Sequence, residues 1–231
     1  MKKVFSSFLL LFLLSSGSIQ AQEDPARYLD ALEKKYSGVK DYTVDVNVRF
    51  DVEALKAPDM QAKLYYKAPD KIKVESKNVF FFPKEGGYFN PSLFRKKDFD
   101  TRLLERLTYD GRKAVKLRLT PTEMNRHHQG FVLTLDTDRN LIREINTSPS
   151  EGRTVRAIIE YGKFTDFELP VHIELHLDIP SVEPNGMKEF GSFSQGSKRI
   201  TGKVEIAYSN YKVNSGLSDE MFKETGLPKP K

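Results

Sequence analysis

The segment from Tyr42 to Val52 alternates between apolar and polar side chains at every position. Tyrosine, valine and phenylalanine occupy its even-numbered positions, and threonine, aspartate, asparagine and arginine occupy the odd-numbered ones. Because successive side chains of a β-strand point to opposite faces, this segment predicts a strand with one apolar face and one wet face. Antiparallel sheets are built from such strands, with one face packed on a core and the other in solvent.

The same alternation returns in eight further segments. They are Met60 to Tyr66, Ile72 to Ser76, Val115 to Leu119, Phe131 to Leu135, Leu141 to Ile145, Val155 to Ile159, Val171 to Leu177 and Ile200 to Tyr208. Turn-forming stretches such as DTDRN at 136–140 separate many of them. The fold class is therefore predicted to be mainly β, with an antiparallel sheet of about nine to eleven strands. A sheet of this size is expected to curl into a barrel or half-barrel.

Two segments have helical signals. Asp24 followed by Pro25 predicts a helix start, and Gly38 predicts its end. The apolar positions that share one face of this helix are Tyr28, Leu29, Leu32 and Tyr36. The leucines in the segment from Asp98 to Leu107 predict a second helix.

Residues 1–21 have the pattern of a secretory signal peptide. Lys2 and Lys3 precede an apolar run from Val4 to Leu14, and the small residues before Ala21 predict cleavage after it. The run is too short to span a bilayer, which takes about 20 apolar residues. We therefore expect an exported, soluble protein with one domain, 22–231. The chain has no cysteine, so we expect neither a lipid anchor nor disulfides.

The charge pattern argues against a nucleic-acid-binding protein. Removal of Lys2 and Lys3 with the signal lowers the formal net charge from +5 to +3, and acidic and basic residues are interspersed along the sequence. The sequence has no Gly-rich phosphate loop, and no cofactor is predicted.

The segment VHIELHLD (171–178) has the most metal-like spacing. His172, Glu174, His176 and Asp178 lie on one face of the predicted strand, where residues two apart stand roughly 7 Å from each other. Two of them could share a zinc ion with ligands from elsewhere. The alternating apolar residues favour a simpler interpretation, in which the four side chains form the wet face of a strand, and no metal site is predicted.

No catalytic residues are predicted, and the protein is not expected to be an enzyme. Ser194 in GSFSQG lacks the second glycine that a nucleophile elbow needs. The carboxylates Asp45, Asp51 and Glu53 alternate with valines and phenylalanine, as on a solvated strand face.

Four stretches, in this order along the chain, resemble a known family. They are LYYKAPDKIKV (64–74), GYFNP (87–91), FVLTLDTDRNLIREINTSPSEGRTVRAIIEYGKF (131–164) and YSNYKVNSGLSDEMF (208–222). With the signal and the N-terminal helix, they are similar to the LolA-like family, which includes the lipoprotein carrier LolA, the receptor LolB and the sigma-factor regulator RseB. Two features depart from the carriers. Ala68 replaces the arginine before the strand-pair proline, and 171–196 is an additional segment.

The resemblance implies an unclosed, half β-barrel whose concave side is covered by the N-terminal helix and short helices. It implies a periplasmic, monomeric carrier or chaperone that holds lipid or lipoprotein acyl chains during outer-membrane lipoprotein sorting. Its partners would be an inner-membrane donor and an outer-membrane acceptor, both transient. The alternative is an RseB-like regulatory module that senses lipid or lipoprotein and binds a membrane signalling protein stably.

The resemblance also raises the question of which apolar side chains would touch a ligand. The stretch NVFFFPKEGGYFNPSLF (78–94) holds five phenylalanines and fits either a packed core strand or a cavity wall. The expected cavity residues share the even-numbered face of their strands: Val44, Val46, Val48, Phe50, Leu64, Tyr66, Ile72, Val74, Phe80 and Phe82. The expected lid is the helix face of Tyr28, Leu29, Leu32 and Tyr36, which could equally be core.

Overall fold

The computed structural model describes residues 24–52, 57–76, 90, 93–122, 130–147, 154–164, 166–180 and 199–223. The predicted signal peptide, 1–21, lies outside the described residues. So do Phe80 and Phe82, two of the ten residues expected to line a cavity.

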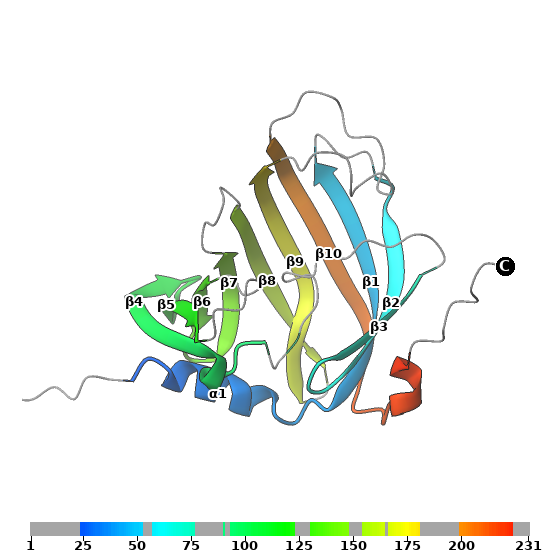
Figure 1. Cartoon of the computed structure of the whole chain (residues 1–231), viewed down its shortest axis with the longest axis horizontal. Coiled ribbons are helices and arrows are strands. Elements are labelled where there is room, and N and C mark those ends of the chain that lie inside the picture. The colour runs from blue at the N-terminus through cyan, green and yellow to red at the C-terminus, as the bar shows by residue number, and fades with distance from the viewer. Residues whose placement is uncertain are drawn as a thin grey trace, which may run out of the picture.

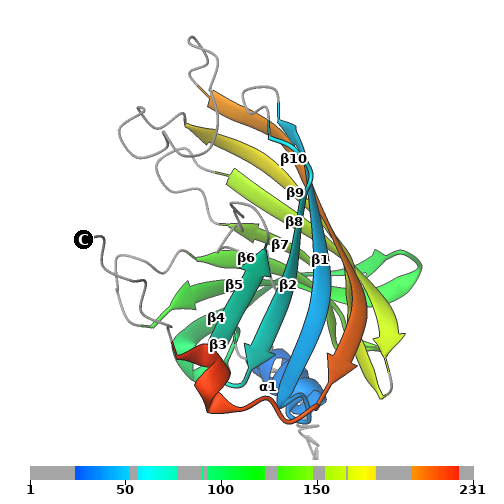
Figure 2. The same cartoon turned by 90° about the vertical axis from the view of Figure 1, so that its right-hand side faces the viewer.

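A single antiparallel sheet of ten strands organises the described chain (Figures 1 and 2). The strands are β1 (Asp41–Val52), β2 (Met60–Lys67), β3 (Lys71–Ser76), β4 (Phe99–Tyr109), β5 (Arg112–Pro121), β6 (Phe131–Asp136), β7 (Leu141–Thr147), β8 (Thr154–Phe164), β9 (Phe167–Pro180) and β10 (Arg199–Val213). Their order in the sheet is β3-β2-β1-β10-β9-β8-β7-β6-β5-β4. The sheet is strongly curved but does not close, because β3 and β4 are its two edges. The predicted mainly β fold class and unclosed barrel are confirmed.

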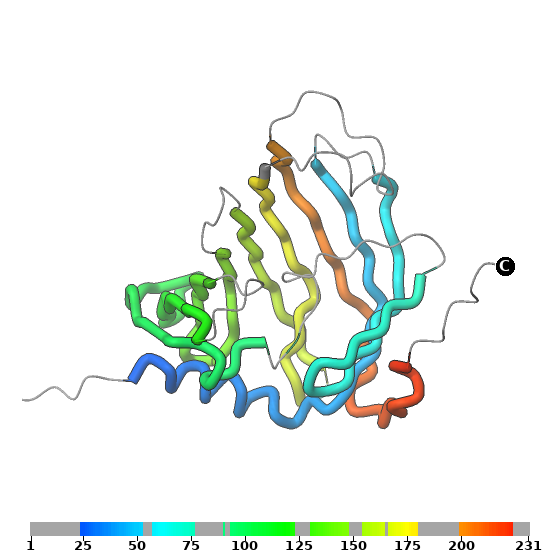
Figure 3. Tube along the Cα trace, in the orientation of Figure 1, coloured from blue at the N-terminus to red at the C-terminus, as the bar shows by residue number. Residues whose placement is uncertain are grey.

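The pairing of β1 with β10 holds the two halves of the sheet together. These strands are far apart in sequence, yet Val46 lies opposite Tyr208, Val48 opposite Ile206 and Phe50 opposite Val204. Every other pair of neighbouring strands in the sheet is also consecutive in sequence, and the chain passes from edge strand β3 to the opposite edge strand β4 (Figure 3).

The described helical elements are one α-helix and two short 3₁₀ turns. Helix α1 (Arg27–Tyr36) lies across one end of the curved sheet (Figure 1). Asp24 helps to start it, since one carboxylate oxygen accepts a hydrogen bond from the Ala26 amide at 2.9 Å. The turns are η1 (Lys96–Asp98) and η3 (Asp219–Phe222). Within the described ranges, no helix is both long and apolar enough to cross a membrane.

The second predicted helix, Asp98 to Leu107, is wrong: this segment is the edge strand β4. It pairs with β5 through a tight turn at Asp110 and Gly111, which have φ angles of 49° and 74°. A β-bulge falls between Leu103 and Glu105. The extra residue, Leu104, interrupts the two-residue alternation, so the leucine spacing imitates a helix.

The register places the apolar side chains of all ten strands on one face. Across β1, β2 and β3 the even-numbered residues stand opposite one another, as in the row Val44, Leu64 and Val74. On the other side of β1, such rows continue through β10, β9 and β8. These residues and the buried face of α1 form one hydrophobic cluster. The concave face is therefore the apolar face.

Candidate functional site

The concave face has a packed end, built from aromatic rings next to α1. The ring centroids of Tyr42 and Tyr66 lie 5.0 Å apart, those of Tyr42 and Tyr211 5.6 Å apart, and those of Phe164 and Tyr211 4.6 Å apart. We call Tyr42, Tyr66, Tyr208, Tyr211 and Phe164 the tyrosine floor. Its rings fill the space between the strands at this end, so this part of the concave face is core.

A local irregularity of β10 supplies two of the floor rings. The register between β1 and β10 shifts between Thr43 and Asp45, beside Asn210, whose φ angle is +56°. The shift allows both Tyr208 and Tyr211 to point into the core, although they are three residues apart. Burial raises the pKa of both phenols well above the ordinary value. The Tyr211 hydroxyl therefore stays protonated and donates a hydrogen bond to the Pro170 carbonyl at 2.9 Å.

Partly exposed apolar side chains continue the concave face beyond the floor. On β1, Phe50 lies eight residues from Tyr42, a distance of roughly 27 Å along a strand. It is only partly buried, as are Leu177 and Ile179 on β9, which the strand register places at the same end of the sheet. The region between the floor and these residues is lined by fully buried valines of β1 and by their neighbours. Val52 and Ile200, at the same end, are buried, so the concave face is only partly open there.

The structure brings together eight of the ten predicted cavity residues. Five are buried with at most 3% of their surface exposed: Val44, Val46, Val48, Leu64 and Tyr66. Three are partly buried and pack against the same cluster: Phe50, Ile72 and Val74. Tyr66 belongs to the tyrosine floor. Phe80 and Phe82 lie outside the described residues, and the ligand-binding role of all ten stays a prediction.

Sequence reasoning missed the contribution of β8, β9 and β10 to this face. The row Val48, Ile206, Ile173 and Ile159 runs across four strands. The alternation in these strands is visible in the sequence. However, it does not reveal that β10 pairs with β1, nor whether the odd or the even residues of each strand share a face with β1.

The predicted lid residues of α1 are all buried against the sheet. Tyr28, Leu29, Leu32 and Tyr36 have between 0 and 6% of their surface exposed. At the C-terminal end of α1 the Tyr36 hydroxyl donates to the Glu168 carbonyl at 3.0 Å. At the other end a guanidinium nitrogen of Arg106 on β4 donates to the Tyr28 hydroxyl at 3.0 Å. This helix therefore bridges distant parts of the sheet, and whether it moves as a lid stays a prediction.

Glu168, at the start of β9, is the centre of the attachment of α1. Its carboxylate accepts from Lys35 at 2.7 Å and is also paired with Arg139 in the β6–β7 turn. Burial acts to raise the pKa of Glu168, but the hydrogen bonds from Lys35 and Arg139 outweigh burial and lower it. These contacts do not involve Ala68, the position where the carriers have arginine.

Three of the four side chains with metal-like spacing, Glu174, His176 and Asp178, have polar partners on the outer face. His176 Nε2 lies 2.6 Å from a Glu174 oxygen, and Glu174 also pairs with Lys203 at 3.1 Å. Asp178 pairs with Arg199 at 2.6 Å. In the part of the chain that the structure describes, no three His, Asp or Glu side chains are grouped so that they could hold a metal ion.

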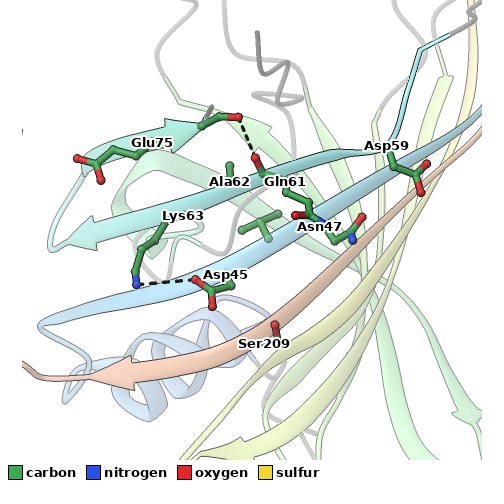
Figure 4. A pocket seen from close by; sticks show the side chains of 10 residues that line it. Asp45, Asn47, Asp59, Gln61, Ala62, Lys63, Glu75 and Ser209 are labelled. Carbon is green, nitrogen blue, oxygen red and sulfur yellow. Dashed lines mark hydrogen bonds and ion pairs between the residues drawn. The ribbon is translucent and has the colours of Figure 1, made fainter. Parts of the chain in front are cut away.

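A hollow of about 720 Å³ lies beside β1, β2 and β3 (Figure 4). Most of the residues that line it are polar or charged, including Asp45, Asn47, Asp59, Gln61, Lys63 and Glu75. Lys63 and Asp45 form an ion pair across it at 3.8 Å. Such a lining would leave polar groups without partners against an apolar ligand, so the partly open apolar face is the better candidate site.

Comparisons with known proteins identify the fold. No family model matches the sequence, and no curated protein matches it. Solved structures do match. A putative outer membrane lipoprotein-sorting protein domain from Vibrio parahaemolyticus is 11% identical, with a TM-score of 0.59 over 86% of this chain and 96% of that one. A LolA superfamily protein from Nitrosomonas europaea is 13% identical, with a TM-score of 0.59 over 89% and 100% of the two chains. A DUF1329 family protein from Desulfovibrio piger is 14% identical, with a TM-score of 0.61 over 89% and 100%.

Proposed function

We propose that this chain, whose fold is LolA-like, is a carrier that binds lipid or the acyl chains of lipoproteins on its concave face. The observation that supports this proposal is the presence of partly exposed apolar side chains on that face. The rings of the tyrosine floor pack against one another at one end, and at the other end Phe50 and Leu177 stay partly exposed beside buried neighbours such as Val52. Burial of these apolar side chains inside the protein would stabilise the fold, so their exposure is better explained by a ligand that covers them.

The chemistry of the face favours a hydrocarbon ligand. Val48, Ile206 and Ile173 stand in one row, and no charged side chain interrupts it. Burial of acyl chains against the partly exposed side chains beside this row would contribute roughly 0.8 kcal/mol per methylene. Because a ligand with several methylenes is then held strongly, its release requires a better acceptor or a conformational change. Helix α1, which is fastened by side-chain contacts at both ends, is our candidate for the moving element.

The biological setting is part of the same proposal. A signal peptide over 1–21 would deliver the chain to the periplasm. The similar structure from Vibrio parahaemolyticus is that of a putative outer membrane lipoprotein-sorting protein domain, which suggests lipoproteins as the cargo. We propose a monomeric carrier with a transient inner-membrane donor and outer-membrane acceptor. In this proposal no bond is made or broken.

Two adjacent substitutions on β1 test the proposal. Phe50→Asn places an amide on the concave face, whereas Asp51→Asn changes the next residue, which is exposed on the opposite face. Titration with a fluorescent fatty acid or an acylated peptide should show saturable uptake by the wild type and by Asp51→Asn. Uptake by Phe50→Asn should be at least tenfold weaker. If the two variants bind the probe equally well, the ligand does not occupy this face.

A second experiment separates a carrier from a regulatory module. The full chain is used as bait in a periplasmic extract, with and without detergent-solubilised membranes. A carrier should release its partners during washing and retain lipid or acylated peptide. A stoichiometric protein partner that survives washing would contradict the carrier proposal.

A further inference from the structure

The sheet edge formed by β4 and β5, with the preceding turn η1, carries an excess of positive charge. Residues 93–120 contain nine Lys and Arg residues and four Asp and Glu residues, a net charge of +5. This equals the formal net charge of the complete chain, +5, so all the other residues together are neutral. The charge of this protein is therefore concentrated at one end of the molecule (Figure 1).

Two arginines stand directly opposite each other on this edge. Arg102 of β4 pairs in register with Arg118 of β5. The adjacent pair, Leu103 and Leu117, faces the core, so the two arginines point to the outer face, where both are exposed. Like charges in directly opposite positions destabilise a sheet. In the described part of the chain, neither arginine forms an ion pair. A bound anion would relieve this repulsion.

Some of the other cations on this edge are neutralised by ion pairs with acidic side chains, and others are not. Lys116 pairs with Glu105 at 3.3 Å, and Arg95 pairs with Asp98 at 2.7 Å. By contrast, Lys97, Arg112 and Lys113 are exposed and have no ion pair among the described residues. Five cations are thus left for an external partner.

Exposed apolar side chains accompany these cations. The described residues include two large hydrophobic side chains that are exposed: Leu93 at 38% and Leu104 at 39%. Leu93 precedes η1, and Leu104 is the extra residue of the β4 bulge, two positions from Arg102. Surface cations together with protruding apolar side chains are typical of proteins that bind the interface of an anionic membrane.

We propose that this basic edge, with its five cations without described ion pairs and the exposed Leu93 and Leu104, docks on the surface of an anionic phospholipid bilayer. The cations attract the lipid phosphates, and the leucines enter the headgroup region. An acidic polypeptide would also satisfy the cations, but it would leave the two leucines unexplained. The proposal does not depend on a ligand in the concave face, although a carrier of lipid would need such contact.

Vesicle sedimentation tests the docking. The probes are vesicles of phosphatidylcholine alone, and vesicles of phosphatidylcholine mixed with an equal amount of phosphatidylglycerol. The variants are the double substitution Arg102→Gln and Arg118→Gln, and the single substitution Leu104→Asn. The matched control is Lys163→Gln with Lys212→Gln, which removes two exposed cations of β8 and β10 that have no described ion pair.

We expect the wild type and the control to bind the anionic vesicles and not the neutral ones, with binding weakened by added salt. The double arginine variant should bind on the order of 25-fold more weakly, because each cation near an anionic surface contributes roughly fivefold. Leu104→Asn should also weaken binding. The arginine variant should be at least as stable to heat as the wild type, since a like-charge pair is removed.

Three results would overturn the docking proposal. The first is an absence of wild-type binding to anionic vesicles. The second is equal weakening by the arginine variant and the lysine control, which would mean that only net charge matters. The third is arginine-dependent binding to polyglutamate without vesicle binding, which would indicate an acidic protein partner. Uptake of the acyl probe without vesicles should be unchanged in the arginine variant. A loss of vesicle binding therefore tests the docking proposal alone, and a loss of acyl-probe uptake tests the proposed function alone.

Discussion

The Nζ atom of Lys35, in the last turn of α1, lies 2.7 Å from the carboxylate of Glu168 at the start of β9. The same carboxylate is paired with Arg139 in the turn between β6 and β7. One side chain thus joins the helix to two separate parts of the sheet. It holds α1 over the packed end of the concave face, next to the tyrosine floor.

Replacement of this carboxylate should loosen the helix. Glu168→Gln removes the charge that Lys35 and Arg139 share, and the free energy of unfolding should fall by roughly 1 kcal/mol, because the pair is partly exposed to solvent. Hydrogen exchange of the α1 amides should become faster, while that of β10 changes little. Glu160→Gln, at an exposed position of β8, is the control and should leave both quantities unchanged. Unaltered exchange in α1 of Glu168→Gln would show that Glu168 does not hold the helix.

The ion pairs of Glu168 should also make the free energy of unfolding depend on pH. The pKa of Glu168 is lowered in the folded protein, so its ion pairs stabilise the fold above the unfolded pKa of about 4.3. This contribution is lost as the pH falls through the lower, folded pKa. Denaturant unfolding at a series of acidic pH values should therefore show a shallower decline for Glu168→Gln than for the wild type. Parallel declines would mean that the ion pairs add no stability.

The two ends of the concave face should respond differently to truncation. Tyr42→Ala removes a ring that is 1% exposed and stacked on Tyr66, and it should cost about 3 to 5 kcal/mol of unfolding free energy. Phe50→Ala removes a partly exposed ring, and we expect a loss of less than about 2 kcal/mol, since less area is buried there. Equal losses, measured by denaturant titration, would show that the face is packed uniformly and is not open at one end.

Gly202 should be irreplaceable in the pairing of β10 with β1. Its φ angle is +148°, and a Cβ at this position would lie 2.5 Å from the Asp51 carbonyl oxygen and 2.7 Å from Val52 Cα. Gly202→Ala should therefore destabilise the protein by more than about 2 kcal/mol, because backbone atoms must shift. Gly111→Ala is the comparison, with a φ angle of +74° and no atom within 4 Å of the added Cβ. It should cost only about 1 kcal/mol, from backbone strain alone. A thermal melt that ranks the two variants in the opposite order would contradict this account of β10.

Local patterns in the sequence predict most of this fold. The alternation in Tyr42 to Val52 depends only on the two-residue period of a strand, and it indicates which face of β1 packs on the core. It does not show that Thr43, on the other face, is buried as well, at 6% exposed. Irregularities disturb such patterns. The bulge at Leu104 made a strand resemble a helix, and the register shift at Asn210 placed Tyr211 on the concave face against the alternation. At both places the alternation breaks, but a break alone does not tell a bulge from the end of a strand or from a helix.

The candidate site is harder to predict, because it depends on contacts between distant segments. The pairing of β1 with β10 sets which residues of β8, β9 and β10 join the face of Val48, and such long-range pairing has no local signature. Likewise, the sequence around Phe50 does not show how far its side chain is exposed, because this depends on neighbouring strands. Similarly, the opposition of Arg102 and Arg118 follows from the turn between β4 and β5.

The central claim is that the partly open concave face holds acyl chains in the cell. The most direct test is mass spectrometry of lipids and acylated peptides extracted from the natively purified, full-length chain, with Phe50→Asn purified in parallel. We predict that lipid or acylated peptide co-purifies with the wild type in stoichiometric amount and is strongly reduced in the variant. A wild-type protein free of both, which also takes up no acyl chain when one is offered, would contradict the account.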